Sequence, residues 1–209
     1  MTHLRVSCVP LAPERLDAFY AFVENEAFTD NAHWASCFCV FPYLRDQREG
    51  EWDARTAEQN RALLGQLVTS GQGSWVVAYL GTSMVRSSAC QRRSRDALCP
   101  LRHLGPAGGG NHRPIHCFVV HPRLRRQGIA RQLLEAAVER LQELGCDYAE
   151  AWVVNDPAAV VRPPLAWEQA AFSGPLSMYL KAGFKIVEQD GEDCRVRRVL
   201  NGRTPGAPG

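Results

Sequence analysis

The sequence has no apolar run long enough to cross a bilayer, and it does not open with a charged segment followed by an apolar one. We therefore expect neither a membrane protein nor an exported one, and we place the protein in the cytoplasm. The formal net charge is only +2, which is too small to predict nucleic-acid binding. An apolar fraction of 45% without internal repeats indicates one globular domain, which we place at residues 1–200. We expect the Pro/Gly-rich tail at residues 201–209 to be disordered.

The most informative segment is residues 125–130, which read Arg-Arg-Gln-Gly-Ile-Ala between a strand-like run at 115–120 and a helical pattern at 129–144. A helix N-terminus presents backbone N–H groups that have no partner inside the helix, and its dipole favours negative charge. Gly128 lets the backbone approach an anion closely, because it carries no Cβ. Three basic side chains can neutralise such an anion: Arg125, Arg126 and Arg131. The segment predicts a site for a phosphorylated ligand.

The remaining elements follow from apolar periodicity. Strands are predicted at residues 4–9, 75–80, 84–90, 115–120, 148–154, 185–189 and 195–200. Helices are predicted from Pro13 onward and at residues 53–69, 129–144 and 173–182. Residues 91–113 and 155–167 are predicted loops. The strand–turn–helix–strand unit at 115–154 normally forms a right-handed parallel crossover, although its second strand could also splay from the first.

Two segments resemble the GNAT (GCN5-related N-acetyltransferase) superfamily. The acyl-CoA signature of that family, Arg/Gln-x-x-Gly-x-Gly/Ala, is similar to the chain at Arg125, Gly128 and Ala130. Residues 177–184, Ser-Met-Tyr-Leu-Lys-Ala-Gly-Phe, resemble its late Tyr-x-x-x-Gly-Phe element. The resemblance implies an α/β (α+β) fold with a mixed, largely antiparallel sheet of about seven strands, a splayed fourth and fifth strand, and about four helices. Within the superfamily, the chain resembles bacterial members that carry an N-terminal Cys-x-Cys stretch.

The resemblance also implies acetyl-CoA as co-substrate and an amine of a small molecule or peptide as acceptor. The residues implied in cofactor binding are Phe118, Val119, Val120, Arg125, Arg126, Gln127, Gly128, Ile129, Ala130 and Arg131. Tyr179 matches the residue that protonates the leaving thiolate, since a phenol is a suitable acid, but it could equally be a packing residue. His116 and Glu150 are alternative bases, each of which could instead be structural. A homodimer is common in the superfamily and stays open.

The eight cysteines are expected to be reduced thiols, and four of them to be core residues: Cys8, Cys117, Cys146 and Cys194. His33, Cys37 and Cys39 could be read as metal ligands, but their spacing is not a familiar zinc pattern, so we predict no metal. We interpret residues 37–41 as an extra strand or as a wall of the acceptor pocket.

Three functions remain open after the sequence. The first is an acyl-CoA-dependent N-acetyltransferase. The second is a GNAT-fold protein that binds acyl-CoA as a ligand or regulator and has little or no turnover. The third, a metal-linked sensor that uses His33, Cys37 and Cys39, is the least supported. The third predicted strand reads Val85-Arg86-Ser87, where relatives often carry Val-Gly-Trp, so this strand does not indicate which acceptor the site binds.

Overall fold

The structure is a computed structural model that describes residues 4–44, 52, 54–91, 112–155, 172–191 and 193–200. Seven strands form a mixed sheet in the order β1-β2-β3-β4-β5-β7-β6. Neighbouring strands are antiparallel except β4 and β5, which are parallel. The strands are β1 (Ser7–Pro10), β2 (Gly73–Leu80), β3 (Ser83–Gln91), β4 (His112–Val120), β5 (Tyr148–Val154), β6 (Lys185–Asp190) and β7 (Asp193–Val199).

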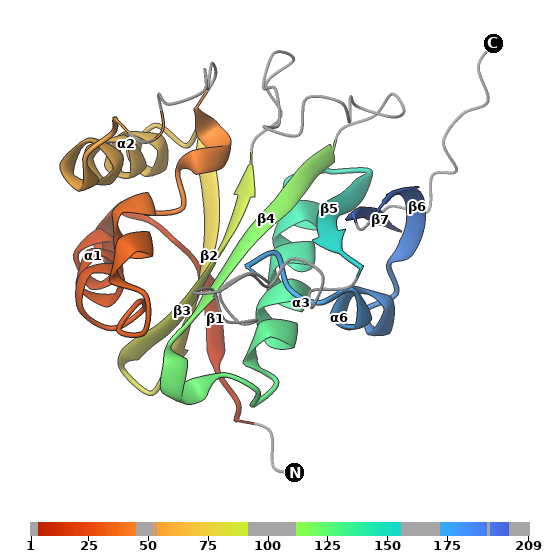
Figure 1. Ribbon diagram of the computed structural model, residues 1–209, viewed down its shortest axis with the longest axis horizontal. Coiled ribbons are helices and arrows are strands. Elements are labelled where there is room, and N and C mark those ends of the chain that lie inside the picture. Colours follow the sequence, from red (N-terminus) through yellow and green to blue (C-terminus); the bar gives the residue numbers. More distant parts are fainter. Residues whose placement is uncertain are drawn as a thin grey trace.

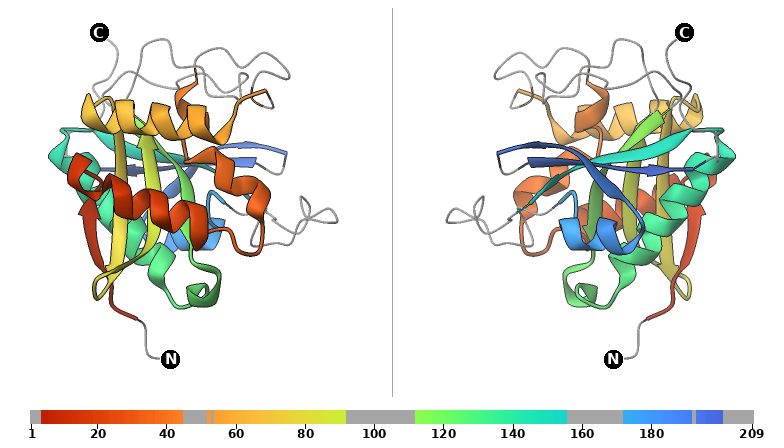
Figure 2. Two further views of the ribbon diagram at one scale, coloured as in Figure 1. Left: turned by 90° about the vertical axis from the view of Figure 1, so that its left-hand side faces the viewer. Right: turned by 90° about the vertical axis from the view of Figure 1, so that its right-hand side faces the viewer.

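Four α-helices of the described chain cover the sheet on both faces (Figure 1 and Figure 2). They are α1 (Leu16–Asn25), α2 (Ala57–Thr69), α3 (Ile129–Glu143) and α6 (Leu176–Lys181). Successive residues of β2 point to opposite faces, so Val77 joins the core beneath α1 and α2 while Val76 and Ala78 join the core beneath α3. The predicted fold class is confirmed. None of the described helices combines the length and the apolar character that crossing a bilayer requires.

Helix α2 begins at Ala57, later than the predicted start at residue 53. Thr56 and Gln59 form a capping box that fixes this start. The Gln59 amide donates to the Thr56 hydroxyl oxygen at 3.2 Å, and the Thr56 amide donates to the Gln59 side-chain oxygen at 3.0 Å. The reciprocal bonds satisfy two N–H groups that the helix leaves without a partner.

The extra strand predicted at residues 37–41 is wrong. The chain there forms two short 3₁₀ helices, η2 (Ala32–Cys37) and η3 (Phe41–Tyr43). Between them Phe38 and Cys39 have φ angles of 46° and 56°, in the left-handed region that a strand does not use. The predicted loop at 91–113 is also too long at its end, because β4 already begins at His112. The rest of that loop beyond residue 91, the second predicted loop after residue 155, and the tail at 201–209 lie outside the described residues.

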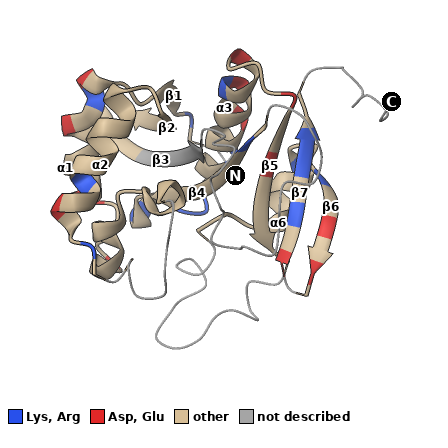
Figure 3. Cartoon of the chain, turned by 90° about the horizontal axis from the view of Figure 1, so that it is seen from above, with Lys and Arg blue, Asp and Glu red and all other residues tan. Residues whose placement is uncertain are grey.

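Basic side chains gather on β7, as Figure 3 shows, and carboxylates of neighbouring elements neutralise them. Arg197 contacts Glu150 of β5 at 2.7 Å, and Arg198 contacts Glu135 of α3 at 2.9 Å. Arg195 pairs with Glu188 of β6. These three arginines therefore join β7 to the elements around it.

Candidate active site

A gap opens between β4 and β5 in the middle of the sheet (Figure 1). The two strands pair over only three positions, from His112 opposite Tyr148 to Pro114 opposite Glu150. Beyond these positions β4 pairs with β3, and β5 pairs with β7. The predicted splay is confirmed, and it turns one edge of residues 115–120 toward the gap.

A β-bulge interrupts β4 where the gap begins. Cys117 is opposite Ala89 and Ile115 is opposite Cys90, so His116 is an extra residue in the ladder. A bulge re-aims the side chains around it and is frequent beside active sites. As a result Ile115 belongs to the core beneath α3, whereas His116 lines a cavity in the gap.

The main chain of β4 presents Phe118 and Val120 to the gap. The Phe118 amide donates to the carbonyl oxygen of Phe172 at 2.7 Å, across the gap. The Val120 carbonyl accepts a bond of 3.3 Å from Nε of Arg125. Gly174 (φ +84°) follows Phe172 in the same crossing, and a Cβ there would lie 2.6 Å from Cε of Met178. The left-handed φ favours glycine at this position, because L-residues adopt it only with strain.

The turn between β4 and α3 has the geometry of an anion site. Arg126 has a φ of 63°, and Gly128, the N-cap of α3, has a φ of 74°. Gly128 has no side chain that could cap α3, and the first turn of the helix contains no acidic residue. Its N-terminal N–H groups therefore suit a negatively charged ligand. The Arg126 side chain is exposed beside them.

Arg125, which is predicted to bind the cofactor, is held in place by an ion pair. Its guanidinium forms an ion pair with both carboxylate oxygens of Asp30, one of them at 3.2 Å. Asp30 lies in the segment between α1 and η2. The pair thus joins the turn to the segment that forms the opposite wall of the gap.

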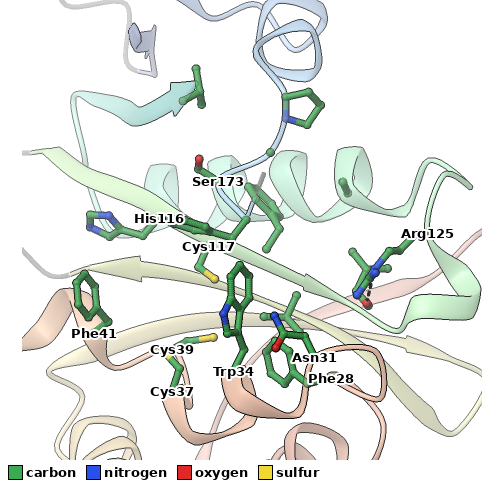
Figure 4. A pocket seen from close by; sticks show the side chains of 18 of the residues that line it. Phe28, Asn31, Trp34, Cys37, Cys39, Phe41, His116, Cys117, Arg125 and Ser173 are labelled. Atoms are coloured by element: carbon green, nitrogen blue, oxygen red, sulfur yellow. Dashed lines mark hydrogen bonds between the residues drawn. The ribbon is translucent and has the colours of Figure 1, made fainter. Parts of the chain in front are cut away.

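The gap contains a cavity of about 1180 Å³ (Figure 4). This volume exceeds that of an ordinary single-ligand pocket, and it can hold an extended cofactor arm together with a second substrate. Of the predicted cofactor-binding residues, those that line it are Phe118, Val119, Val120, Arg125, Arg126, Gly128, Ile129 and Ala130. Gln127 and Arg131 are not among the described residues that line it, and Gln127 donates to the Arg123 carbonyl at 3.3 Å.

Of the three candidate catalytic residues, only His116 lines the cavity in the described part of the chain. Its side chain is half-buried, and burial lowers its pKa from 6.5 to about 4. At neutral pH the imidazole is uncharged, so it can accept a hydrogen bond or a proton.

Tyr179 is fully buried on α6. Its hydroxyl donates to the Ser173 carbonyl at 2.7 Å, and its ring packs edge-on against Phe118 and Phe184. Ser173 itself lines the cavity. Tyr179 therefore holds a piece of the cavity wall, and its assignment as a proton donor stays a prediction.

Glu150 is buried on β5 and engaged in ion pairs. Its carboxylate contacts Arg197 at 2.7 Å and Nε2 of His112 at 3.4 Å. The His112 ring stacks on Tyr148, with 4.8 Å between the ring centres. This cluster lies where β4 and β5 still pair, so its position favours a structural role at the start of the splay.

Residues of the loop between α1 and α2 form another wall of the cavity, and the interpretation of residues 37–41 as a wall of the acceptor pocket stays a prediction. Cys37, Cys39 and Phe41 all line it. Burial and the neighbouring Cys39 raise the pKa of Cys37 to about 12, which keeps this thiol protonated. Among the described residues, no three His, Cys, Asp or Glu side chains come together in a way that could hold a metal ion.

Two aromatic residues of the site were not predicted. Trp34 of η2 and Phe172 lie edge-to-face with ring centres 6.2 Å apart, and both line the cavity. They come from opposite walls. Trp34 could have been suspected from its place next to the Cys-x-Cys stretch, whereas Phe172 follows a predicted loop and carried no signal.

Solved structures similar to this one include several acetyltransferases. PaiA N-acetyltransferase of Thermoplasma acidophilum in complex with coenzyme A has a TM-score of 0.53 and 14% identity, over 93% of this chain and 99% of that one. A GNAT-family acetyltransferase of Listeria monocytogenes has a TM-score of 0.55 and 11% identity, over 96% and 99%. A chain of the NatC complex bound to Gag peptide and CoA has a TM-score of 0.53 and 15% identity, over 94% and 99%. At these identities the likeness shows the fold alone.

No curated protein matches the sequence. A family model does: that of the acetyltransferase (GNAT) family matches residues 28–162, more than half of the chain. This range contains the splayed strands, the bulge and the glycine turn. The chain therefore belongs to the GNAT family of acetyltransferases.

Proposed function

We propose that this protein transfers an acetyl group from acetyl-CoA to a primary amine of a small molecule or peptide. The main observation behind the proposal is that two features line the same cavity. An uncapped helix N-terminus with a left-handed glycine lies at one end, and a splayed strand with a bulged His116 lies along it. The first suits a diphosphate, and the second suits an extended amide-containing arm.

The cofactor fits the residues present. Backbone amides at the start of α3 would hold its pyrophosphate, with the exposed Arg126 beside them, and the gap-facing main chain of Phe118 and Val120 would align its pantetheine arm. Bound acetyl-CoA would supply an activated acyl thioester. Because the Phe118 amide already donates to Phe172, a ligand that takes this amide must shift the Phe172 carbonyl.

The chain's own contribution to the reaction is positioning and proton transfer. The neutral imidazole of His116 would accept a hydrogen bond from the amine and help it enter unprotonated. In the overall reaction a nitrogen–carbon bond forms, the carbon–sulfur bond breaks, and one proton passes from the nitrogen to the departing sulfur. Effective placement of the two reactants supplies much of the rate enhancement in such transfers.

Two measurements test the proposal. Calorimetric titration with acetyl-CoA is expected to show stoichiometric binding, and a thiol assay is expected to show CoA release with at least one member of a diverse amine panel. A protein that does not bind acetyl-CoA refutes the proposal.

The second candidate, an acyl-CoA-binding protein with little or no turnover, is favoured by one contact. The Tyr179 hydroxyl donates to the Ser173 carbonyl and not toward the cavity, so the predicted proton donor is engaged elsewhere. Tight acetyl-CoA binding without CoA release above the rate of spontaneous hydrolysis, across the whole amine panel, would establish this alternative.

A further inference from the structure

Trp34 lies between two ends of the cavity lining. In Figure 4, Arg125 lies on one side of its ring, and His116 and Phe41 lie on the other. Because the pyrophosphate is proposed to bind at the turn, the second end is left for the acceptor. We call it the aromatic end and define it by Trp34, Cys37, Cys39, Phe41, Trp52, His116 and Cys117.

The aromatic end is built from rings and thiols. Phe41 and Trp52 pack edge-to-face with ring centres 4.8 Å apart, and Trp34 packs in the same manner on Phe172. Between them stand Cys37 and Cys39, of which Cys37 is held as a neutral thiol. Such a lining gains free energy by covering a large apolar group, above all an aromatic one that can pack edge-on.

The charges around this end are unfavourable for a polycation. Arg55 lines the cavity and donates through Nε to the buried side-chain oxygen of Asn60 at 2.6 Å. Asn60 in turn donates to the Ser36 carbonyl at 2.9 Å, which fixes the guanidinium against η2. Two carboxylates line the cavity within the described residues, Asp30 and Asp193. Neither belongs to the aromatic end: Asp30 pairs with Arg125 on the far side of Trp34, and Asp193 begins β7.

We propose that the aromatic end binds an acceptor with a single amino group on an aromatic body, of the arylalkylamine class, and discriminates against polyamines. This inference rests on the proposed function and names the substrate class of the same site. Only one amino group of an acceptor has to become neutral for transfer. Each further ammonium of a polyamine would be desolvated next to rings and a guanidinium, with no carboxylate partner among the described residues of this end, and that costs far more than an aromatic body does.

The test compares phenethylamine and tryptamine with spermidine as acceptors, by kcat/KM from CoA release. We expect the aromatic amines to be preferred at least about tenfold, a ratio within reach of a pocket that selects by apolar contact. Trp34→Ala should raise the KM for phenethylamine about tenfold and leave the Kd for acetyl-CoA within about threefold, whereas Trp34→Phe should restore most of the difference. A preference for spermidine, or an unchanged KM in Trp34→Ala, overturns the inference and leaves the proposed function standing.

Two further measurements keep the inference testable if turnover is slow or a variant misfolds. Calorimetric titration of tryptamine and of spermidine into the CoA-saturated protein measures acceptor binding without acetyl transfer, and only tryptamine should give measurable heat.

The two variants Cys37→Asp and Cys37→Ser differ in one charge at the aromatic end. The aspartate should raise the spermidine-to-phenethylamine ratio of kcat/KM at least about fivefold over the serine, because it offers an ammonium a partner. Equal ratios count against the inference. If acetyl-CoA itself does not bind, the proposed function falls and this inference falls with it.

Discussion

The glycine at the start of α3 provides the sharpest test of the cofactor site, through a matched pair of variants. Gly128 has a φ of 74°, a conformation that asparagine and aspartate tolerate better than other L-residues. Gly128→Asn and Gly128→Asp therefore impose similar backbone strain, of about 1 kcal/mol each. The two variants differ by a single negative charge at the helix N-terminus.

The charge should weaken acetyl-CoA binding by a predictable amount. A diphosphate held on the first amides of α3 would lie about 5 Å from the new carboxylate, and two unit charges at that distance repel by about 3 kcal/mol at an effective dielectric of about 20. The turn is half-exposed and salt screens the interaction, so we expect about 1.4–2.8 kcal/mol, which is roughly a 10- to 100-fold difference in Kd between the two variants.

The same charge should have the opposite effect on the free protein. A carboxylate at an N-cap stabilises a helix through its orphan amides and its dipole, so Gly128→Asp should melt no lower than Gly128→Asn. Calorimetry at low and moderate salt and thermal melts of the unliganded variants provide both readings. Equal Kd values for the two variants would refute the placement of the diphosphate at this turn, whatever their stabilities.

Three other substitutions test the remaining candidate residues. Tyr179→Phe removes the hydroxyl that donates to the buried Ser173 carbonyl, so we expect the free energy of unfolding to fall by about 1–2 kcal/mol and the Tm by about 2–8 °C, with kcat within about threefold of the wild type. A fall in kcat of about 100-fold would instead identify the hydroxyl as the general acid. Glu150→Gln removes the carboxylate charge that lies 2.7 Å from Arg197 in a buried ion pair, so the Tm should fall by roughly 10 °C, while kcat measured well below the Tm stays within about twofold. A stable but inactive variant would restore Glu150 as the base. The pKa of His116 is lowered to about 4, so between pH 6.5 and 4 the unfolded chain binds a proton that the folded chain does not, and the free energy of unfolding falls as the pH drops through this window. In His116→Asn this loss should be smaller, by at most about 3 kcal/mol. If the Tm of the variant and of the wild-type protein depended equally on pH, that result would contradict the burial of this imidazole.

The sequence predicted the elements around the proposed cofactor site, because they follow regular apolar periods and are joined by one glycine turn. The apolar run of β4, the helical spacing of α3 and the strand after it all appear where they were expected. Helix boundaries were less exact. The predicted start of α2 was four residues too early, and the Thr56-x-x-Gln59 pattern is the capping-box signal in the sequence that marks the observed start.

The extra strand at residues 37–41 failed for a physical reason. A short run with Cys, Phe and Val has the composition of a strand, but Phe38 and Cys39 adopt left-handed backbone angles that no local pattern reveals. Non-glycine residues keep such angles only where the surroundings over-determine them. Here Phe38 is buried against the ring of Tyr20, with 6.0 Å between ring centres, so tertiary packing decides the conformation.

The two halves of the site differ in how their chemistry is encoded. The proposed cofactor contacts come from backbone groups of β4 and α3, and any sequence that builds these elements with glycine at position 128 provides them. The aromatic end depends on side chains that meet only in the folded chain: Trp34 reaches Phe172 from the opposite wall, and Phe41 reaches Trp52. Such contacts leave no periodic pattern in the sequence from which they could be predicted. A likeness of fold at 11–15% identity therefore carries no information about the aromatic end, and acceptor choice must be measured on this protein.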